Sequence, residues 1–359
     1  MSAADAGVDA WDRFCDALKA AGRTIREAAP DPASIERAEG MRFLTRMLRH
    51  SLEAQLEYAD PDFPAFYCPS HETIKLNADN PDTLHFMAPL SGRHAYRLAG
   101  TRGSVHRIVF TTLARAPGRT DYTVSGALDT RELALAADGT FEIAVARKPA
   151  RGNWLPMRED TVALLVRAIF LDREREAAPA LRLDRIGTRA APAVLAPAAI
   201  DARLAAVAAS TAGLAQHMAR LAAIYRERGW INRLEEDAAL WGSGDPSARY
   251  LQGWWQLAPD EALVVESDVP ECFFWNFQLN NAWMESLDYR WQRIHVNKAG
   301  AHYEADGRVR IVIAHSDPGL PNWLSTAGHG CGTMVSRWIE ARAMPRMTAR
   351  VLPLAALRG

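Results

Sequence analysis

The first sixty residues carry the spacing of amphipathic helices. Apolar residues recur every three or four positions from Val8 to Ala28, as a helix with one buried face requires. A pair of prolines ends this run, and a second helical pattern continues to about Tyr58. The turn-forming segment Asp60–Pro64 then interrupts it. The pattern predicts an N-terminal helical segment over residues 1–66.

From about residue 67 to residue 190 the apolar runs shorten to strand length, with turn residues between them. We expect strands at His85–Leu90, Tyr96–Ala99, Val105–Thr112, Tyr122–Val124, Phe141–Val145 and Val162–Leu171. The sequence Thr101–Ser104 predicts a hairpin turn between two of them. Short strands at regular spacing, without helices between them, are typical of a sandwich or barrel and not of a parallel βαβ array.

A second helical region separates these strands from a later set. Pro192 and Pro197 mark its start, and Ala198–Arg228 is a long alanine-rich stretch with one apolar face. Strands resume at Ala262–Ser267, Cys272–Leu279 and Arg308–His315. Because each strand set alone is too small to cover a core, we expect one sandwich. Its first part covers residues 67–190, its second part 251–359, and a helical insertion over 191–250 interrupts it.

Composition narrows the class of partner. The chain has 359 residues, of which 48% are hydrophobic and 24% charged, the balance of a globular protein. With 42 basic and 43 acidic side chains the formal net charge is −1, and no basic run stands out. Binding to nucleic acid needs a basic surplus or patch, so the sequence predicts no nucleic-acid partner.

The termini and the cysteines bear on location. Residues Met1–Ala10 lack the basic and apolar regions of a signal peptide. No uninterrupted apolar stretch of about 18 residues occurs, so we expect no membrane span. The 4 cysteines are scattered without a Cys-x-x-Cys pair, which favours reduced thiols. The sequence therefore predicts a cytoplasmic protein.

Several motifs resemble one known family. They are Asn80-Pro81-Asp82, Gly152-Asn153-Trp154-Leu155, Trp275-Asn276 with Gln278, Asn280 and Trp283, then Asn297, Asp306-Gly307, Asp317-Pro318-Gly319, Pro321-Asn322-Trp323-Leu324, Gly328-His329 and Arg337-Trp338. Over about Glu39 to Trp338 the chain resembles the bacterial family catalogued as domain of unknown function 1214. The resemblance implies a mixed β with α fold: a jelly-roll-like antiparallel β-sandwich with N-terminal helices and a helical insertion. The family supplies no established reaction.

Two loops share the sequence Asn-Trp-Leu. The second, Asn322-Trp323-Leu324, follows a turn in which two prolines flank a glycine and fix the backbone. A rigid loop of this kind could present Asp317 and Asn322 to a substrate. Alternatively, both side chains bond their own turn while Trp323 fills the core. The first loop, Asn153-Trp154-Leu155, has a similar context, which favours structurally equivalent corners.

One predicted strand carries a row of amides. Alternation places Asn276, Gln278 and Asn280 on one face. These amides either face solvent or form the wall of a polar pocket, where they would hold hydroxyls and carbonyls of a substrate. Trp283 belongs to a group of tryptophans between positions 254 and 291 that either lines an apolar or sugar-binding pocket or fills the core.

Three titratable or charged residues are candidates for chemistry. His329 lies in the glycine-rich stretch Gly328–Gly332 and is either a general acid or base or an exposed loop residue. Asp82 is either a catalytic carboxylate or a backbone clamp. Arg167 lies on an otherwise apolar strand, so it pairs with a carboxylate of the protein or of a substrate.

Fingerprints of cofactor enzymes are absent from the sequence. The glycine-rich stretch has Met334 where a dinucleotide-binding loop needs glycine or alanine. His295, His302 and Glu304 form a loose array without the close His-x-His spacing of jelly-roll metal sites. We therefore expect no cofactor and no metal. His295, His302 and Glu304 are the only candidate metal ligands that the sequence offers.

Two hypotheses from different classes follow. The first is a cofactor-independent enzyme, a hydratase, lyase or hydrolase, acting on a neutral, largely apolar, hydroxyl-bearing molecule such as a terpenoid, steroid or glycoside. Asp317 or Asp82 with His329 would transfer protons, while the amide row, Asn322, Trp323, Trp283 and Arg167 would hold the substrate. The second is a non-catalytic carbohydrate- or lipid-binding sandwich. Either takes a small-molecule partner, and a homo-oligomer is compatible with both.

Overall fold

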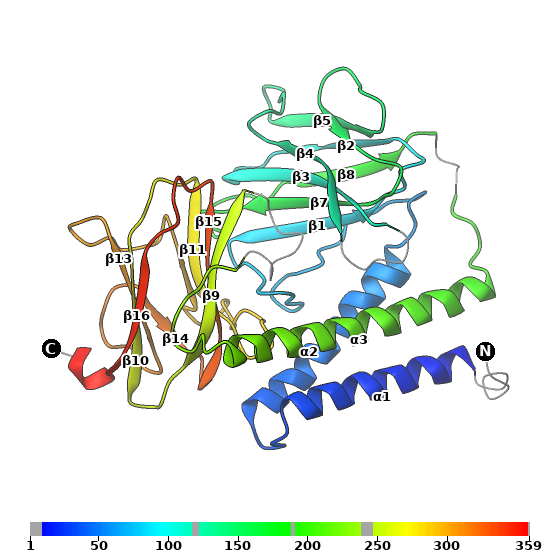
Figure 1. The fold of residues 1–359 in the computed structure, drawn as a ribbon. Helices are drawn as coiled ribbons and strands as arrows, with labels where there is room; N and C mark the ends of the chain where they lie inside the picture. Colours follow the sequence, from blue (N-terminus) through cyan, green and yellow to red (C-terminus); the bar gives the residue numbers. More distant parts are fainter. Residues whose placement is uncertain (1–8, 117–121, 188–190, 238–246, 358–359) are drawn as a thin grey trace. The chain divides into compact units, whose positions relative to one another are not determined.

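The helices lie close to where the periodicity places them. The computed structural model describes residues 9–116, 122–187, 191–237 and 247–357 (Figure 1). Helix α1 spans Ala10–Ala28, α2 spans Ile35–Leu52 and continues as a π-helical turn to Glu57, and α3 spans Pro197–Glu227. The predicted first residue of α1, Val8, lies outside the described residues.

The described residues form 16 strands in four sheets, which confirms the predicted β-sandwich class with helices. The strands of the first half are β1 Thr83–Pro89, β2 Tyr96–Thr101, β3 Arg107–Ala114, β4 Thr123–Asp129, β5 Thr140–Ala146, β6 Trp154–Pro156, β7 Thr161–Ile169 and β8 Ala180–Arg185. Those of the second half are β9 Ala248–Gln256, β10 Glu261–Ser267, β11 Phe274–Leu279, β12 His295–Asn297, β13 Val309–Ala314, β14 Trp323–Ser325, β15 Cys331–Ile339 and β16 Met347–Pro353.

The two halves have the same strand topology. The first half has sheets of order β1-β7-β3-β4 and β6-β5-β2-β8, and the second has β9-β15-β11-β12 and β14-β13-β10-β16. Adding eight to each strand number of the first half gives the second. All the pairs are antiparallel except β5 with β6 and β13 with β14, which also correspond. The chain thus contains two eight-stranded sandwiches where the sequence pattern predicted one.

Each sandwich has its own core, and this is the physical reason for the difference. The first core takes buried residues from all of β1 to β8, among them Tyr96, Phe110 and Val166. The second is built on large aromatics, with Trp275 stacked on Trp338 at a ring-centroid distance of 5.5 Å. The strands that the pattern missed, such as the three-residue β6 and β14, complete each sheet. The predicted hairpin at Thr101–Ser104 is wrong, because β2 and β3 belong to different sheets.

The chain divides into two compact units. The first comprises Met1–Gly22, Thr45–Ile74 and Asp82–Leu214, and the second comprises Arg23–Leu44, Lys75–Pro81 and Ala215–Gly359. In the first unit, Phe14 of α1, Leu48 of α2 and Val207 of α3 pack together. Within the described residues, α3 is the one helix long and apolar enough to cross a membrane by length and composition; a packed core helix meets the same criteria.

Candidate functional site

The two Asn-Trp-Leu loops are equivalent structural corners. The side chain of Asn322 accepts a hydrogen bond from the N–H of His302 (2.8 Å) and donates to the carbonyls of His302 (2.8 Å) and Arg310 (3.0 Å). Asp317 is exposed and accepts a hydrogen bond from the N–H of Gly319 at 2.7 Å. Trp323 donates its indole N–H to Ala314 and packs on the outer face of β10 and β13. These contacts are those of a clamped turn.

The amide row of β11 faces neither solvent nor an open pocket. Asn276, Gln278 and Asn280 are fully buried, and the first two bond to the segment Lys75–Pro81 of the same unit. Asn276 donates to the side chain of Asn80 at 2.7 Å, and Gln278 donates to the carbonyl of Asp79 at 2.9 Å. The row therefore fastens this segment to the sheet.

Buried charges complete the same network. Arg337 of β15 donates to Gln278 Oε1 at 2.5 Å and to the carbonyl of Ala78. Lys75 donates to the carbonyls of Ser286 and Leu287 at 2.5 and 3.0 Å. Sequence analysis gave these two residues no role, because partners so far apart along the chain leave no local signal.

Asp82 and Arg167 belong to the first unit, whereas this network belongs to the second. Asp82 is buried, and its carbonyl accepts a hydrogen bond from the N–H of Phe170 at 2.8 Å. Arg167 donates to the hydroxyl of Thr111 at 3.3 Å. Arg167 holds the same strand position in β7 that Arg337 holds in β15, two residues before the end of the matching strand pair with β3 or β11.

His329 lies in a buried setting and has a carboxylate beside it. The residue is 9% exposed, and its Nδ1 is 3.2 Å from the carbonyl of Thr326. Its Nε2 lies 3.9 Å from Oε1 of Glu39 on α2 and has no hydrogen-bond partner among the described residues. Glu39 in turn lies 3.5 Å from the amide nitrogen of Asn281. His329 thus has a neighbouring proton acceptor, the carboxylate of Glu39.

A cavity of about 280 Å³ opens beside this pair, and all the residues that line it belong to the second unit. Its walls come from the turn between α1 and α2, the C-terminal end of α3, and the sheet containing β9 and β15. Trp254, Trp283, Ala219 and Ala222 supply apolar surface. Trp283 stacks on Phe43 at 5.9 Å and donates its indole N–H to the carbonyl of Glu36 at 2.7 Å.

Polar groups gather at one side of the cavity. The thiol of Cys331 lies 3.6 Å from Oε1 of Glu36. Burial and the negative charge of Glu36 raise the pKa of this thiol to about 12, so it stays protonated. The guanidinium of Arg226 lies over the ring of Trp254, 5.1 Å from its centroid. Glu36 and Glu39 are one helical turn apart on α2, so the cavity and the His329 pair adjoin along this helix.

Trp283, the tryptophan group that begins at Trp254, and His329 are candidates from the sequence pattern, whereas Glu36 and Glu39 are not. One signal was present in α2: a glycine in the middle of a helix. A Cβ at Gly40 would lie 2.5 Å from the ring of Trp283 and 2.7 Å from Ile25. Because such a glycine marks a close contact, it indicates that this helix face packs tightly and is not simply solvated.

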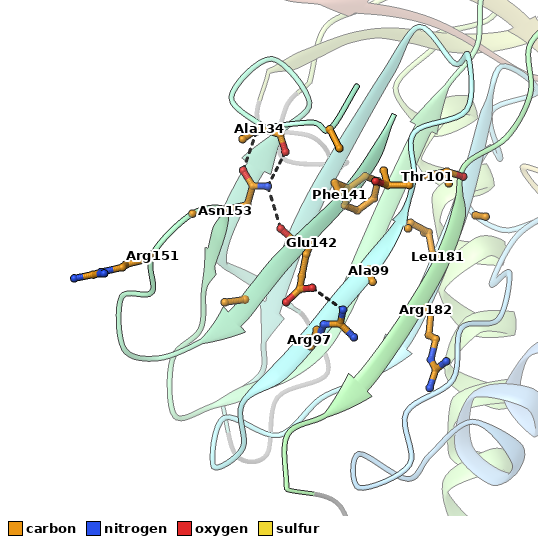
Figure 2. Close-up of a pocket in the computed structure, with 16 residues that line it drawn as sticks. Arg97, Ala99, Thr101, Ala134, Phe141, Glu142, Arg151, Asn153, Leu181 and Arg182 are labelled. Carbon is orange, nitrogen blue, oxygen red and sulfur yellow. Dashed lines mark hydrogen bonds and ion pairs between the residues drawn. The ribbon is translucent and has the colours of Figure 1, made fainter. Parts of the chain in front are cut away.

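The first sandwich carries a larger, more open groove of about 860 Å³ on its β6-β5-β2-β8 sheet (Figure 2). Figure 2 shows its floor crossed by the ion pair of Arg97 with Glu142, 2.6 Å apart. Its lining contains one aromatic residue, Phe141, which is buried. Asn153, at the rim, donates to the carbonyls of Ala134 and Glu142 at 2.9 and 3.0 Å.

The second sandwich has a smaller depression of about 330 Å³ at the equivalent place. Ala136 and Thr140 close a turn in the first sandwich through the same backbone hydrogen bond that joins Glu304 and Arg308 in the second. Small side chains in the first repeat thus stand where charged ones stand in the second.

The three candidate metal ligands are spread over one strand and one loop. His295 is half-buried on β12, whereas His302 and Glu304 are exposed before β13. Across the described residues, no group of three or more His, Cys, Asp or Glu is placed to hold a metal ion.

Comparison with known proteins identifies the family of the chain and several similar structures. A family model described as "Protein of unknown function (DUF1214)" matches residues 85–170 and 256–342, one stretch in each sandwich. A crystal structure of an uncharacterized protein from Burkholderia cenocepacia is 44% identical, covers 97% of both chains and has a TM-score of 0.92. One from Vibrio parahaemolyticus is 12% identical, covers 94% of this chain and 99% of that one, with a TM-score of 0.48. No curated protein matches.

Proposed function

The chain belongs to the family of proteins of unknown function DUF1214, and from that premise we propose that its second unit binds a neutral, largely apolar small molecule in the cavity beside Trp254 and Trp283. The observation that supports this is the convergence of apolar walls and a few polar groups on one cavity.

Size and charge define the ligand. An apolar cavity of about 150 Å³ holds benzene, so the space here suits a molecule of roughly ten to twelve heavy atoms. This favours a compact terpenoid over a steroid or glycoside. The wall carries the carboxylates Asp31 and Glu36 and the guanidinium of Arg226. With two acidic groups and one basic group in the lining, a carboxylate ligand would be repelled, and a neutral one is favoured.

A cavity-filling variant tests the proposal. Camphor and menthol should raise the melting temperature of the wild type by about 3 °C at a tenfold excess over the dissociation constant. Ala219→Leu places a larger side chain in the cavity wall, so it should abolish this shift. Gln216→Leu, at an exposed position of the same helix, is the matched control and should keep it. Equal shifts in Ala219→Leu, or none in the wild type, would contradict the proposal.

A second candidate function is acid–base catalysis on the bound molecule, as a lyase or hydrolase. It is favoured by His329 Nε2, buried beside Glu39 and without a hydrogen-bond partner among the described residues. We assign proton transfer to this pair in place of Asp317 or Asp82. His329→Asn should abolish product formation from a bound compound without weakening its binding, whereas His302→Asn, at an exposed position, should change neither. If the wild type binds a compound but forms no product from it, the catalytic function fails and only the binding function stands.

A further inference from the structure

The outer face of one sheet in the second sandwich is covered by the chain itself. Val312 of β13 is 1% exposed and belongs to an apolar cluster with Leu320, Leu354 and Leu357. Leu320 lies in the loop before β14, and the other two lie in the 3-10 turn Leu354–Leu357 that follows β16. This face of the sandwich therefore packs against segments of polypeptide.

The equivalent face of the first sandwich carries the open groove of Figure 2. The matching parallel pairs β5–β6 and β13–β14 align Ala144 with Val312, and counting back from β6 and β14 aligns Arg151 with Leu320. Both Ala144 and Arg151 line the groove. The groove of about 860 Å³ thus extends over positions that are covered in the second sandwich.

Cationic side chains dominate the lining of this groove. Arg97 pairs with Glu142 at 2.6 Å on the floor, and Arg182 pairs with Asp184 at 3.0 Å. Arg151, at the left of Figure 2, extends from its loop and makes no hydrogen bond or ion pair within the part of the chain that the structure describes. One end of the groove therefore has an arginine whose charge is not matched.

The loop that carries Arg151 is itself basic. Arg147 and Lys148 of the same loop are exposed, and neither makes a hydrogen bond or an ion pair to another described residue. The corresponding loop of the second sandwich, His315–Pro321, contains no lysine or arginine and carries Asp317. This end of the groove is thus complementary to carboxylates, which arginine and lysine bind through charge-assisted hydrogen bonds.

We propose that this groove binds an extended acidic segment of a partner protein, with its carboxylates against the loop 147–152 and its small side chains over Ala99 and Ala144. The polypeptide cover of the second sandwich supports a peptide as the occupant. The one aromatic lining residue, Phe141, is buried, so the lining offers no ring for stacking on a sugar or a base. The site belongs to the first unit, whereas the cavity of the proposed function belongs to the second.

The floor of the groove also limits the kind of anion. The Glu142 side chain is 58% exposed there, and it repels a ligand that carries a negative charge on every unit, such as a nucleic acid or a polyuronate. A peptide can place neutral residues beside Glu142 and acidic residues beside Arg151. The spacing of charges therefore favours a peptide over these two polyanions.

Fluorescence anisotropy with a labelled octapeptide of alternating aspartate and alanine tests the proposal. The full-length wild type should bind it at low ionic strength, and the same peptide with asparagine for aspartate should bind about tenfold more weakly. Tetragalacturonate and pentathymidylate, with as many anionic groups as the aspartate peptide, should compete for the site more weakly than the unlabelled peptide. Failure of the aspartate peptide to bind, or equal binding of the asparagine peptide, overturns the proposal.

Variants then locate the site. Arg151→Gln should weaken binding of the aspartate peptide about threefold, and Ala144→Tyr, which places a ring on the floor of the groove, should abolish it. Arg175→Gln is the matched control, because it removes the same charge from an exposed position outside the groove, and it should leave binding unchanged. Equal losses in Arg151→Gln and Arg175→Gln, or stronger competition by either polyanion than by the unlabelled peptide, contradict the assignment.

Discussion

Asn153 and Asn322 make the same hydrogen bonds at equivalent corners of the two sandwiches. Each side-chain oxygen accepts one backbone N–H, and each side-chain nitrogen donates to two carbonyls. In both, the next residue is a tryptophan that donates its indole N–H to the last residue of the neighbouring parallel strand, Ala146 or Ala314. The corner is therefore a repeated structural device that joins a parallel strand pair to each sandwich.

The corners should differ in their contribution to stability. Asn322 is 1% exposed and has a φ of +52°, a left-handed conformation that alanine adopts poorly, whereas Asn153 is half-buried. We expect Asn322→Ala to lower the free energy of unfolding by about 3 kcal/mol and Asn153→Ala by about 1 kcal/mol. Urea denaturation of both variants measures the difference, and equal losses would contradict this interpretation of the corners.

The sandwich class and the helices follow from the sequence, but the duplication does not. Long periodic segments such as Ala198–Arg228 identify α3 almost to the residue. In contrast, β12 and β14 have three residues each, too few for an alternating pattern. The Asn-Trp-Leu repeat was the one sequence sign of two equivalent halves, and the pattern could not show that each half closes its own core.

The equivalent arginines on β7 and β15 give a second comparison. Arg337 is buried and donates to Gln278 and Ala78, so its loss leaves buried acceptors without a donor. Arg167 is only half-buried. Substitution by methionine keeps most of the volume, and we expect a loss of about 3 kcal/mol for Arg337→Met and about 1 kcal/mol for Arg167→Met. Thermal unfolding checks this order; the reverse order would show that the network around Gln278 does not hold the Lys75–Pro81 segment.

The covering of the amide row explains why that part of the site could not be predicted. Alternation correctly placed Asn276, Gln278 and Asn280 on one face. Asn80 and Asp79, the partners of Asn276 and Gln278, lie almost two hundred residues earlier in the chain, and only the folded structure brings them together. A polar face on a strand is compatible with solvent, a pocket or a covering segment, and the local sequence does not distinguish them.

Cys331 should react slowly with alkylating agents. Its pKa of about 12 leaves roughly one thiol in ten thousand ionised at pH 8, whereas about a quarter of an ordinary cysteine is ionised there. Iodoacetamide should therefore modify Cys331 at least about tenfold more slowly than the half-buried Cys15. Glu36→Gln removes the charge that contributes to the high pKa and should speed the reaction. Mass spectrometry of labelled peptides follows both sites, and Cys331 reacting as fast as Cys15 would contradict the raised pKa of this thiol.

Acid should weaken one buried ion pair of the first sandwich. Burial alone would raise the pKa of Asp129, but hydrogen bonds from Arg131 and the charge of Arg107 outweigh it, so the pKa lies below its usual value. A lowered folded-state pKa stabilises the protein above the unfolded pKa of about 3.9, and this stabilisation is lost as pH falls through the folded value.

The free-energy difference between wild type and Asp129→Asn should therefore shrink from pH 6 to pH 3. Urea unfolding at pH 6, 4 and 3 measures it. A difference that stays constant over this range would show that the ionised carboxylate of Asp129 does not stabilise the folded protein.

Locating a bound ligand tests the central claim, the cavity beside Trp254 and Trp283, most directly. Crystals grown with 4-bromoacetophenone, a neutral carbonyl compound of suitable size, would reveal the bromine by its anomalous scattering. The account predicts a bromine peak inside the cavity bounded by Trp254, Trp283 and Cys331. A bromine peak only in the groove beside Arg97, or no bound bromine at all, would contradict it.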